Sequence, residues 1–146
     1  MEIKIRKAEL KDIEDILKIA GLLYLDIPKF VWNTKEFIER QINAGNYYVA
    51  LSDDKIVGII GLRQRKKKMY IETIAINKES RSRGISKILI EFAKKYTREK
   101  NLNILFACSF YEYNVKDFYL SQSFSLLKKP GKYNGHEYYC FEMFVQ

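Results

Sequence analysis

One junction in this sequence restricts the fold more than any other feature. A strand-like stretch, MYIETIAI at residues 69–76, runs directly into NKESRSRGISKILIEFAKKY at residues 77–96. The second stretch begins polar and takes helical spacing after Gly84. Its apolar residues then fall on one face: Ile85, Ile88, Leu89, Phe92, Ala93 and Tyr96. The sequence therefore predicts a strand that turns into a helix at a glycine.

A helix that starts at such a turn presents a site for an anion. Its first N–H groups have no helical partner and carry partial positive charge, and a glycine lets a phosphate approach the backbone closely. Arg81 and Arg83 can donate charge-assisted hydrogen bonds to phosphate oxygens. The turn matches neither the P-loop nor the dinucleotide fingerprint. We expect a pyrophosphate cradle; an ordinary basic helix start is the alternative.

Composition narrows the class of protein. The chain has 146 residues, of which 47% are hydrophobic and 30% charged, so we expect one globular domain over residues 1–146. We expect a cytoplasmic protein without a membrane partner, because no long apolar run or signal peptide is present. Cys108 and Cys140 have no metal-ligand spacing and are expected to be buried, reduced thiols, and His136 is the only histidine. No metal site is expected.

Periodicity along the rest of the chain predicts an α/β domain with a largely antiparallel sheet, in the order β-α-α-β-β-β-α-β-α-β-β. Thr34 is expected to cap the second helix. The apolar run LNILFACS at residues 102–109 suggests a strand buried on both faces. The closing strands are expected in SFSLLKKP and HEYYCFEMFV, with a turn in PGKYNG between them.

The junction resembles motif A of the Gcn5-related N-acetyltransferases, the GNAT superfamily, whose pattern is [QR]-x-x-G-x-[GA]. Here it reads Arg81-Ser82-Arg83-Gly84-Ile85-Ser86, with Ser86 in place of the usual Gly or Ala. NVKDFYLSQSF at residues 114–124 is similar to motif B, with Ser123 replacing its usual glycine and a shorter interval after Asn114 than in many members. The resemblance covers nearly the whole chain. It implies the GNAT acyl-CoA N-acyltransferase fold, in which a mixed, mostly antiparallel sheet is flanked by helices.

The resemblance also implies acetyl-CoA as co-substrate and direct acetyl transfer to a primary amine. The implied cofactor-binding residues lie on the fourth strand, around the turn, and at the first residue of the stretch similar to motif B: Ile74, Ile76, Arg81, Arg83, Gly84, Ile85, Ser86, Lys87 and Asn114. In the family the fourth strand splays from the fifth, and the pantetheine arm pairs with the freed backbone groups. Plain core packing is the alternative for Ile74 and Ile76.

Two side chains are candidates for catalysis. Tyr119 matches the tyrosine that protonates the departing thiolate in the family, and its phenol pKa, near 10, is close to that of a thiol. A core tyrosine is the alternative. Glu72 is a candidate base, with a solvated strand residue or a water chain as alternatives, and a bulge is expected in its strand.

The amine acceptor stays open among a protein N-terminus, a lysine, a polyamine, an aminoglycoside and an amino acid. Candidate acceptor residues are aromatic or acidic: Tyr24, Asp26, Phe30, Trp32, Tyr111, Glu112 and Tyr113. A non-catalytic acyl-CoA sensor on the same fold is the second hypothesis, and a homodimer is also open. The formal charge of +8 suits anionic partners. The basic run at residues 63–68 is nevertheless short and lacks interleaved aromatics, so no nucleic-acid partner is expected.

Overall fold

The computed structural model describes residues 2–146. Its helices are α1 (Ile13–Ala20), α2 (Lys35–Asn43), α3 (Ile85–Glu99) and α4 (Lys116–Ser121), with 3₁₀ turns η1 (Leu10–Asp12), η2 (Gly21–Leu23), η3 (Lys78–Ser80) and η4 (Tyr111–Tyr113). Its strands are β1 (Ile3–Lys7), β2 (Tyr47–Ser52), β3 (Lys55–Arg65), β4 (Lys68–Ile76), β5 (Ile104–Phe110), β6 (Ser125–Leu126), β7 (Gly131–Tyr133) and β8 (His136–Phe144).

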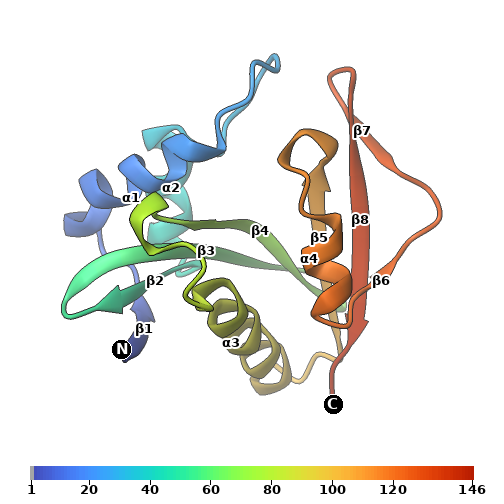
Figure 1. Cartoon of the computed structure of the whole chain (residues 1–146). Helices are drawn as coiled ribbons and strands as arrows, with labels where there is room; N and C mark the ends of the chain where they lie inside the picture. Colours follow the sequence, from blue (N-terminus) through green and yellow to red (C-terminus); the bar gives the residue numbers. More distant parts are fainter. Residues whose placement is uncertain (1) are drawn as a thin grey trace.

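All strands belong to one sheet in the order β1-β2-β3-β4-β5-β8-β6, with β7 paired to β8. The pairs are antiparallel except for β4 with β5, which run parallel. The helical connection through α3 makes this parallel pair. The mixed, mostly antiparallel sheet is confirmed, and so is the expected element order up to α4 (Figure 1).

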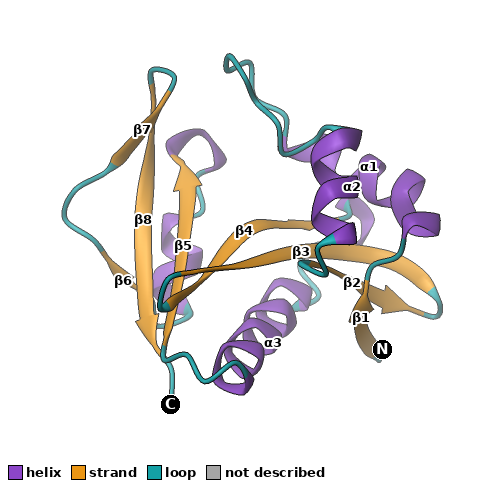
Figure 2. Cartoon of the chain, turned by 180° about the vertical axis from the view of Figure 1, so that it is seen from behind, coloured by secondary structure: helices purple, strands orange, loops and turns teal. Residues whose placement is uncertain are grey.

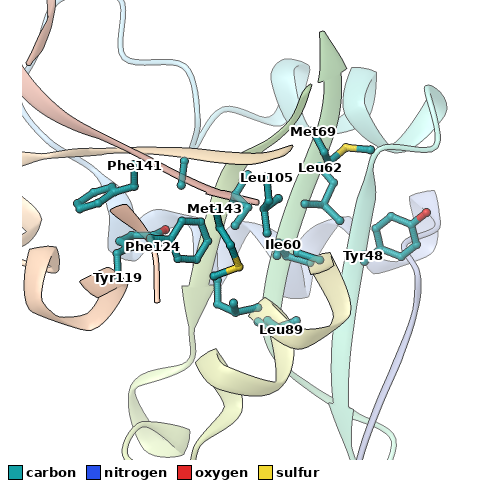
Figure 3. Packing of buried hydrophobic residues seen from close by; sticks show 14 of the residues in the cluster. Tyr48, Ile60, Leu62, Met69, Leu89, Leu105, Tyr119, Phe124, Phe141 and Met143 are labelled. Carbon is teal, nitrogen blue, oxygen red and sulfur yellow. The ribbon is translucent and has the colours of Figure 1, made fainter. Parts of the chain in front are cut away.

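Two apolar clusters cover the two faces of the sheet. On one face, α1 and α2 contribute Ile16 and Ile38, which are fully buried against strand residues such as Ile59. On the other, α3 packs its Leu89 against the sheet, and α4 contributes Tyr119 (Figure 3). The cap of α2 forms as expected, because the Phe37 N–H donates to Thr34 Oγ1 at 3.3 Å.

The sheet opens where β4 leaves β5. Only residues 69–71 of β4 pair with residues 105–107 of β5, and beyond them the two strands diverge (Figure 2). β4 also carries the expected bulge: Leu62 pairs with Ile71 while Gly61 pairs with Thr73, so Glu72 is the extra residue. The bulge and the divergence together open the sheet between its two halves.

Three expectations about the elements were wrong in part. A third closing strand, β7, forms at residues 131–133, inside the segment expected to be a turn. Ile88 of α3 is 37% exposed and Ile90 is buried instead, because the buried stripe of the helix centres on Ile85, Leu89 and Ala93. β5 is not buried on both faces, and Cys108 is exposed. Its outer face borders the opening beside β4 rather than a helix.

Candidate active-site cleft

A cleft of about 1080 Å³ occupies the opening between β4 and β5. We name the two parts of the cleft the α3 half and the β5 half, after elements that build them. The α3 half is formed by Ile74 and Ile76 of β4 and by lining residues of the turn at 80–87. The β5 half draws on the loop after α1, on β3, β5, β7 and β8, and on the start of β4; its residues include Trp32, Arg63, Arg65, Tyr70, Phe106, Cys108, Phe110, Tyr113, Tyr133, Tyr138 and Cys140.

The α3 half presents backbone groups at the start of a helix. Gly84 is the N-cap of α3 with φ 76°, in the left-handed region that favours glycine, and no side chain caps the helix. A Cβ at Gly84 would meet no atom within 4 Å, so the space beside it is open. An anion at this position would face the first N–H groups of a helix of four turns.

Most of the expected cofactor-binding residues come together here. Seven of the nine that the resemblance implies line the cleft, along β4 or around the turn: Ile74, Ile76, Arg81, Gly84, Ile85, Ser86 and Lys87. The β4 edge at Ile74 and Ile76 faces the opening, because β5 does not pair with it there. Arg83 and Asn114 lie outside the lining; Asn114 is an exposed, left-handed residue that ends η4, with φ 53°.

Tyr119 projects from α4 into the wall of the cleft and is only 3% exposed. Its ring stacks on Phe141 with 4.8 Å between centroids and meets Phe124 edge-on (Figure 3). Burial raises the pKa of its phenol well above the ordinary value. Burial therefore moves this pKa away from the ordinary phenol value on which the sequence-based assignment relied. The hydroxyl keeps its proton at neutral pH.

Glu72 stands at the bulge of β4, where its carboxylate receives a 2.7 Å ion pair from Arg63 Nη2 of β3. Burial raises the pKa of Glu72 above the usual range for a glutamate, although the charges of Arg63 and Arg65 oppose the change. Two polar atoms nearby in the structure, Arg63 Nε and Thr73 Oγ1, are buried without a hydrogen-bond partner. Both residues line the cleft.

Aromatic rings form much of the β5 half. Trp32 meets Tyr133 and Phe110 edge-on, at 5.3 and 5.8 Å between centroids. Of the acceptor candidates that the sequence suggested, Trp32 and Tyr113 line the cleft. The others do not: Tyr24, Asp26, Phe30, Tyr111 and Glu112. The Glu112 carboxylate instead pairs with His136 Nδ1 at 2.5 Å, which lowers the pKa of Glu112.

Hydrogen bonds fasten the loop after α1 to the C-terminal part of the chain. Tyr133 Oη donates to the Lys29 carbonyl and Asn134 Nδ2 to the Pro28 carbonyl, each at 2.6 Å. Tyr113 Oη donates to the Leu23 carbonyl, also at 2.6 Å. The hydroxyl of Tyr113, one of the acceptor candidates that line the cleft, is thus engaged in holding the loop.

Sequence reasoning missed several residues of the cleft. Arg63 and Arg65 were considered only as part of the basic run at residues 63–68, and Phe110, Tyr133 and Tyr138 were not singled out. Strand alternation carried a signal for only some of them: it places Arg63 and Arg65 on one face of β3, and Tyr138 on the same face of β8 as Cys140.

Within residues 2–146 no helix is long and apolar enough to cross a membrane. Over the same residues, no group of three or more His, Cys, Asp or Glu side chains is arranged to hold a metal ion.

Solved structures share this fold. The PaiA N-acetyltransferase of Thermoplasma acidophilum in complex with coenzyme A superposes with a TM-score of 0.83 at 20% identity, covering 99% of this chain and 100% of that one. Ard1 from Thermoplasma volcanium gives 0.85 at 19% identity, with 100% and 99% covered. N-acetylglutamate synthase from Neisseria gonorrhoeae, complexed with coenzyme A and N-acetyl-glutamate, gives 0.85 at 18% identity; all of this chain matches 36% of that one.

No curated protein matches the sequence significantly. The model of the acetyltransferase (GNAT) family does match, over residues 13–124. That span is more than half of the 146 residues and includes α3, β4 and α4, which build the α3 half of the cleft and carry Tyr119. The chain therefore belongs to the acetyltransferase (GNAT) family.

Proposed function

We propose that this protein transfers the acetyl group of acetyl-CoA directly to a primary amine. One observation carries the proposal: a single cleft includes the glycine turn at α3, the unpaired edge of β4, Tyr119 and Glu72. Family membership supports it. So does the coenzyme A bound in the structurally similar PaiA N-acetyltransferase and N-acetylglutamate synthase.

Each part of the α3 half suits one part of acetyl-CoA. The first N–H groups of α3, with Arg81 and Lys87 beside them, would hold the pyrophosphate. The backbone of β4 at Ile74 and Ile76 offers hydrogen bonds to the two amides of the pantetheine arm, as to an added strand. We propose that Gly84, Ile85 and Ser86 also bind the pyrophosphate, through their backbone groups.

The reaction needs a base for the amine and an acid for the thiolate. In our proposal Glu72 accepts a proton from the ammonium form of the acceptor. The free amine then attacks the carbonyl carbon of the thioester, the C–S bond breaks, and Tyr119 protonates the thiolate. The new amide nitrogen then loses its extra proton, which restores the Tyr119 hydroxyl through water. The raised pKa of Glu72 suits a base that works near neutral pH. The raised pKa of Tyr119 means that the thiolate must approach the hydroxyl closely to take its proton.

Charges in the cleft limit the acceptor. Glu72 is the one carboxylate among the lining residues of the described chain, and Arg63 already pairs with it. No second carboxylate remains in the lining for another ammonium group, while Arg65 adds a further positive charge. We propose an acceptor whose reactive amine neighbours apolar or anionic groups, such as an amino acid or a peptide N-terminus, rather than a polyamine or an aminoglycoside.

Two measurements test the function. Acetyl-CoA at millimolar concentration should raise the thermal midpoint through linkage, and coenzyme A release should follow addition of the right amine. The acceptor panel pairs spermidine and kanamycin with glutamate, phenylalanine and short peptides. No thermal shift would contradict the assignment. A shift without thiol release from any amine would favour the acyl-CoA sensor instead, and best turnover with spermidine would contradict the proposed acceptor class.

A further inference from the structure

Two cysteine thiols face each other in the β5 half of the cleft. Cys108 on β5 and Cys140 on β8 are register partners, and their Sγ atoms lie 3.7 Å apart. Both are free, and both line the cleft. Cys108 is exposed and Cys140 half-buried, so reagents in solution can reach the pair. Neither thiol has a role in the proposed acetyl transfer.

The register makes a bond between them geometrically feasible. The Cys140 carbonyl accepts from the Leu127 N–H at 2.8 Å, on the side of β8 away from β5. Because the N–H and C=O of an antiparallel strand residue point to the same edge, Cys140 forms a non-hydrogen-bonded pair with Cys108. Such pairs have Cα atoms about 4.5 Å apart, which lies inside the disulfide range of roughly 4.4–6.8 Å. Side-chain rotation can then bring the sulfurs to bonding distance without moving the strands.

We propose that Cys108 and Cys140 are a redox modification site, at which a hydroperoxide closes a reversible disulfide across β5 and β8. One thiolate attacks the peroxide oxygen, forming a sulfenic acid and releasing water or an alcohol. The second thiol attacks that sulfur and expels its hydroxyl as water, which forms the S–S bond. The two cysteines lose two electrons and two hydrogens, and the hydroperoxide is reduced. A dithiol reductant restores both thiols.

The reaction should become faster as the pH rises. Burial of the thiol raises the pKa of Cys108, and the neighbouring Cys140 thiol raises it further. The phenols of Tyr119 and Tyr138 are the other titratable groups that interact with it. The thiolate is the nucleophile, so its fraction limits the first step.

The disulfide would change the cleft on its β5 side. Cys140 lies two residues from Tyr138 on the same face of β8, and Cys108 lies two residues from Phe106 on the same face of β5. Drawing the sulfurs together alters the wall against which the acceptor would lie and leaves the turn at Gly84 untouched. Oxidation should therefore slow acetylation of the acceptor while acetyl-CoA binds as before. This consequence rests on the proposed function.

The experiment treats the reduced full chain with hydrogen peroxide and maps the products by mass spectrometry. We expect a loss of about two mass units, the two thiol hydrogens, within the monomer, a linked pair of peptides containing Cys108 and Cys140, and reversal by dithiothreitol. Cys108→Ser and Cys140→Ser should each abolish the intramolecular link. Acetyl transfer to the best amine of the panel should fall at least about fivefold in the oxidised protein, and peroxide should not change the rate of Cys140→Ser.

Each other outcome overturns part of the proposal. Intermolecular dimers, sulfinic acids or unreacted thiols as the main product would exclude the modification site. A mapped disulfide with an unchanged rate of acetyl transfer would exclude the effect on the acceptor. If the reduced protein acetylates no amine, the proposed function fails, and peptide mapping still decides the disulfide.

Discussion

The two halves of the cleft are built in different ways. The α3 half comes from one continuous segment, residues 74–87, and presents backbone groups at a helix start and along an unpaired strand edge. The β5 half takes side chains from residues as far apart as Trp32 and Cys140. Backbone geometry suits acetyl-CoA, which stays the same whatever the acceptor is. The side chains of the β5 half come from many elements, so they can differ without disturbing the turn at Gly84. The comparison predicts separable effects of mutations on acetyl-CoA binding and on acceptor use.

Tyr119→Phe, at the meeting point of the halves, should have the largest effect. The ring keeps its stack on Phe141 and only the hydroxyl is lost. Turnover should fall about a hundredfold, the lower range for one general acid, while the KM for acetyl-CoA changes little. Tyr47→Phe is the matched control, because Tyr47 is also buried and its hydroxyl has no partner in the structure. Equal steady-state rates for wild type and Tyr119→Phe would make Tyr119 structural.

Glu72→Gln should lower turnover by about thirtyfold, a smaller loss because water can replace the base in part. Glu72 must be ionised to act, so the wild-type rate should rise with pH through a pKa above the usual glutamate range, and the variant should lack this rise. The control is Glu142→Gln, which removes another half-buried glutamate that pairs with a lysine outside the cleft. Identical pH–rate profiles for Glu72→Gln and wild type would exclude the base.

The same pKa shift affects stability. A folded-state pKa above the unfolded value means that Glu72 favours folding below its unfolded pKa and loses this contribution as the pH rises through the folded pKa. The thermal midpoint of wild type relative to Glu72→Gln should therefore fall as the pH rises through that window.

Gly84→Val tests the α3 half alone. The φ of 76° strains any β-branched residue, and the new side chain would occupy the open space beside the helix start. We expect acetyl-CoA to bind at least about tenfold more weakly, about 1.4 kcal/mol, by titration calorimetry. Gly135→Val provides the control, since Gly135 also has a positive φ of 87° and open space but lies in the β7–β8 turn. Equal weakening by both variants would point to general strain.

Trp32→Leu tests the β5 half and should have the smallest effect. It removes ring contacts with Tyr133 and Phe110 at the cleft wall. The KM for the acceptor should rise about threefold, within the range of one lost aromatic pair, and the affinity for acetyl-CoA should not change. The control is Tyr24→Leu, which alters the same loop at a residue outside the cleft lining. A weaker affinity for acetyl-CoA in Trp32→Leu would show that the halves are not separable.

Local patterns predicted the start of α3 and the cap of α2 for a physical reason, whereas the bulge in β4 was expected from the family resemblance. Gly84 at a helix start and Thr34 as a cap each depend on a few neighbouring residues. Helix capping, positive φ and strand alternation act over that range. Asn114 was the exception, because its place came from motif spacing that this chain shortens.

Most of the β5 half could not be predicted, because it depends on register between distant strands. The ion pair of Arg63 with Glu72 joins residues nine apart through the β3–β4 hairpin. Cys108 was expected in a fully buried strand, and its exposure follows from the divergence of β4, which no residue in β5 itself encodes. Side-chain type alone cannot reveal which strands separate.

The place of β8 in the sheet affects the order in which the protein can fold. β8 lies between β5 and β6, so one edge of β5 has no partner until residues 138–144 arrive, about 30 residues later in the chain. A nascent chain therefore exposes an unpaired strand edge, the kind of surface that promotes aggregation, after α3 has already been synthesised. The wall that carries Cys108 should consequently be the last part of the cleft to form during synthesis.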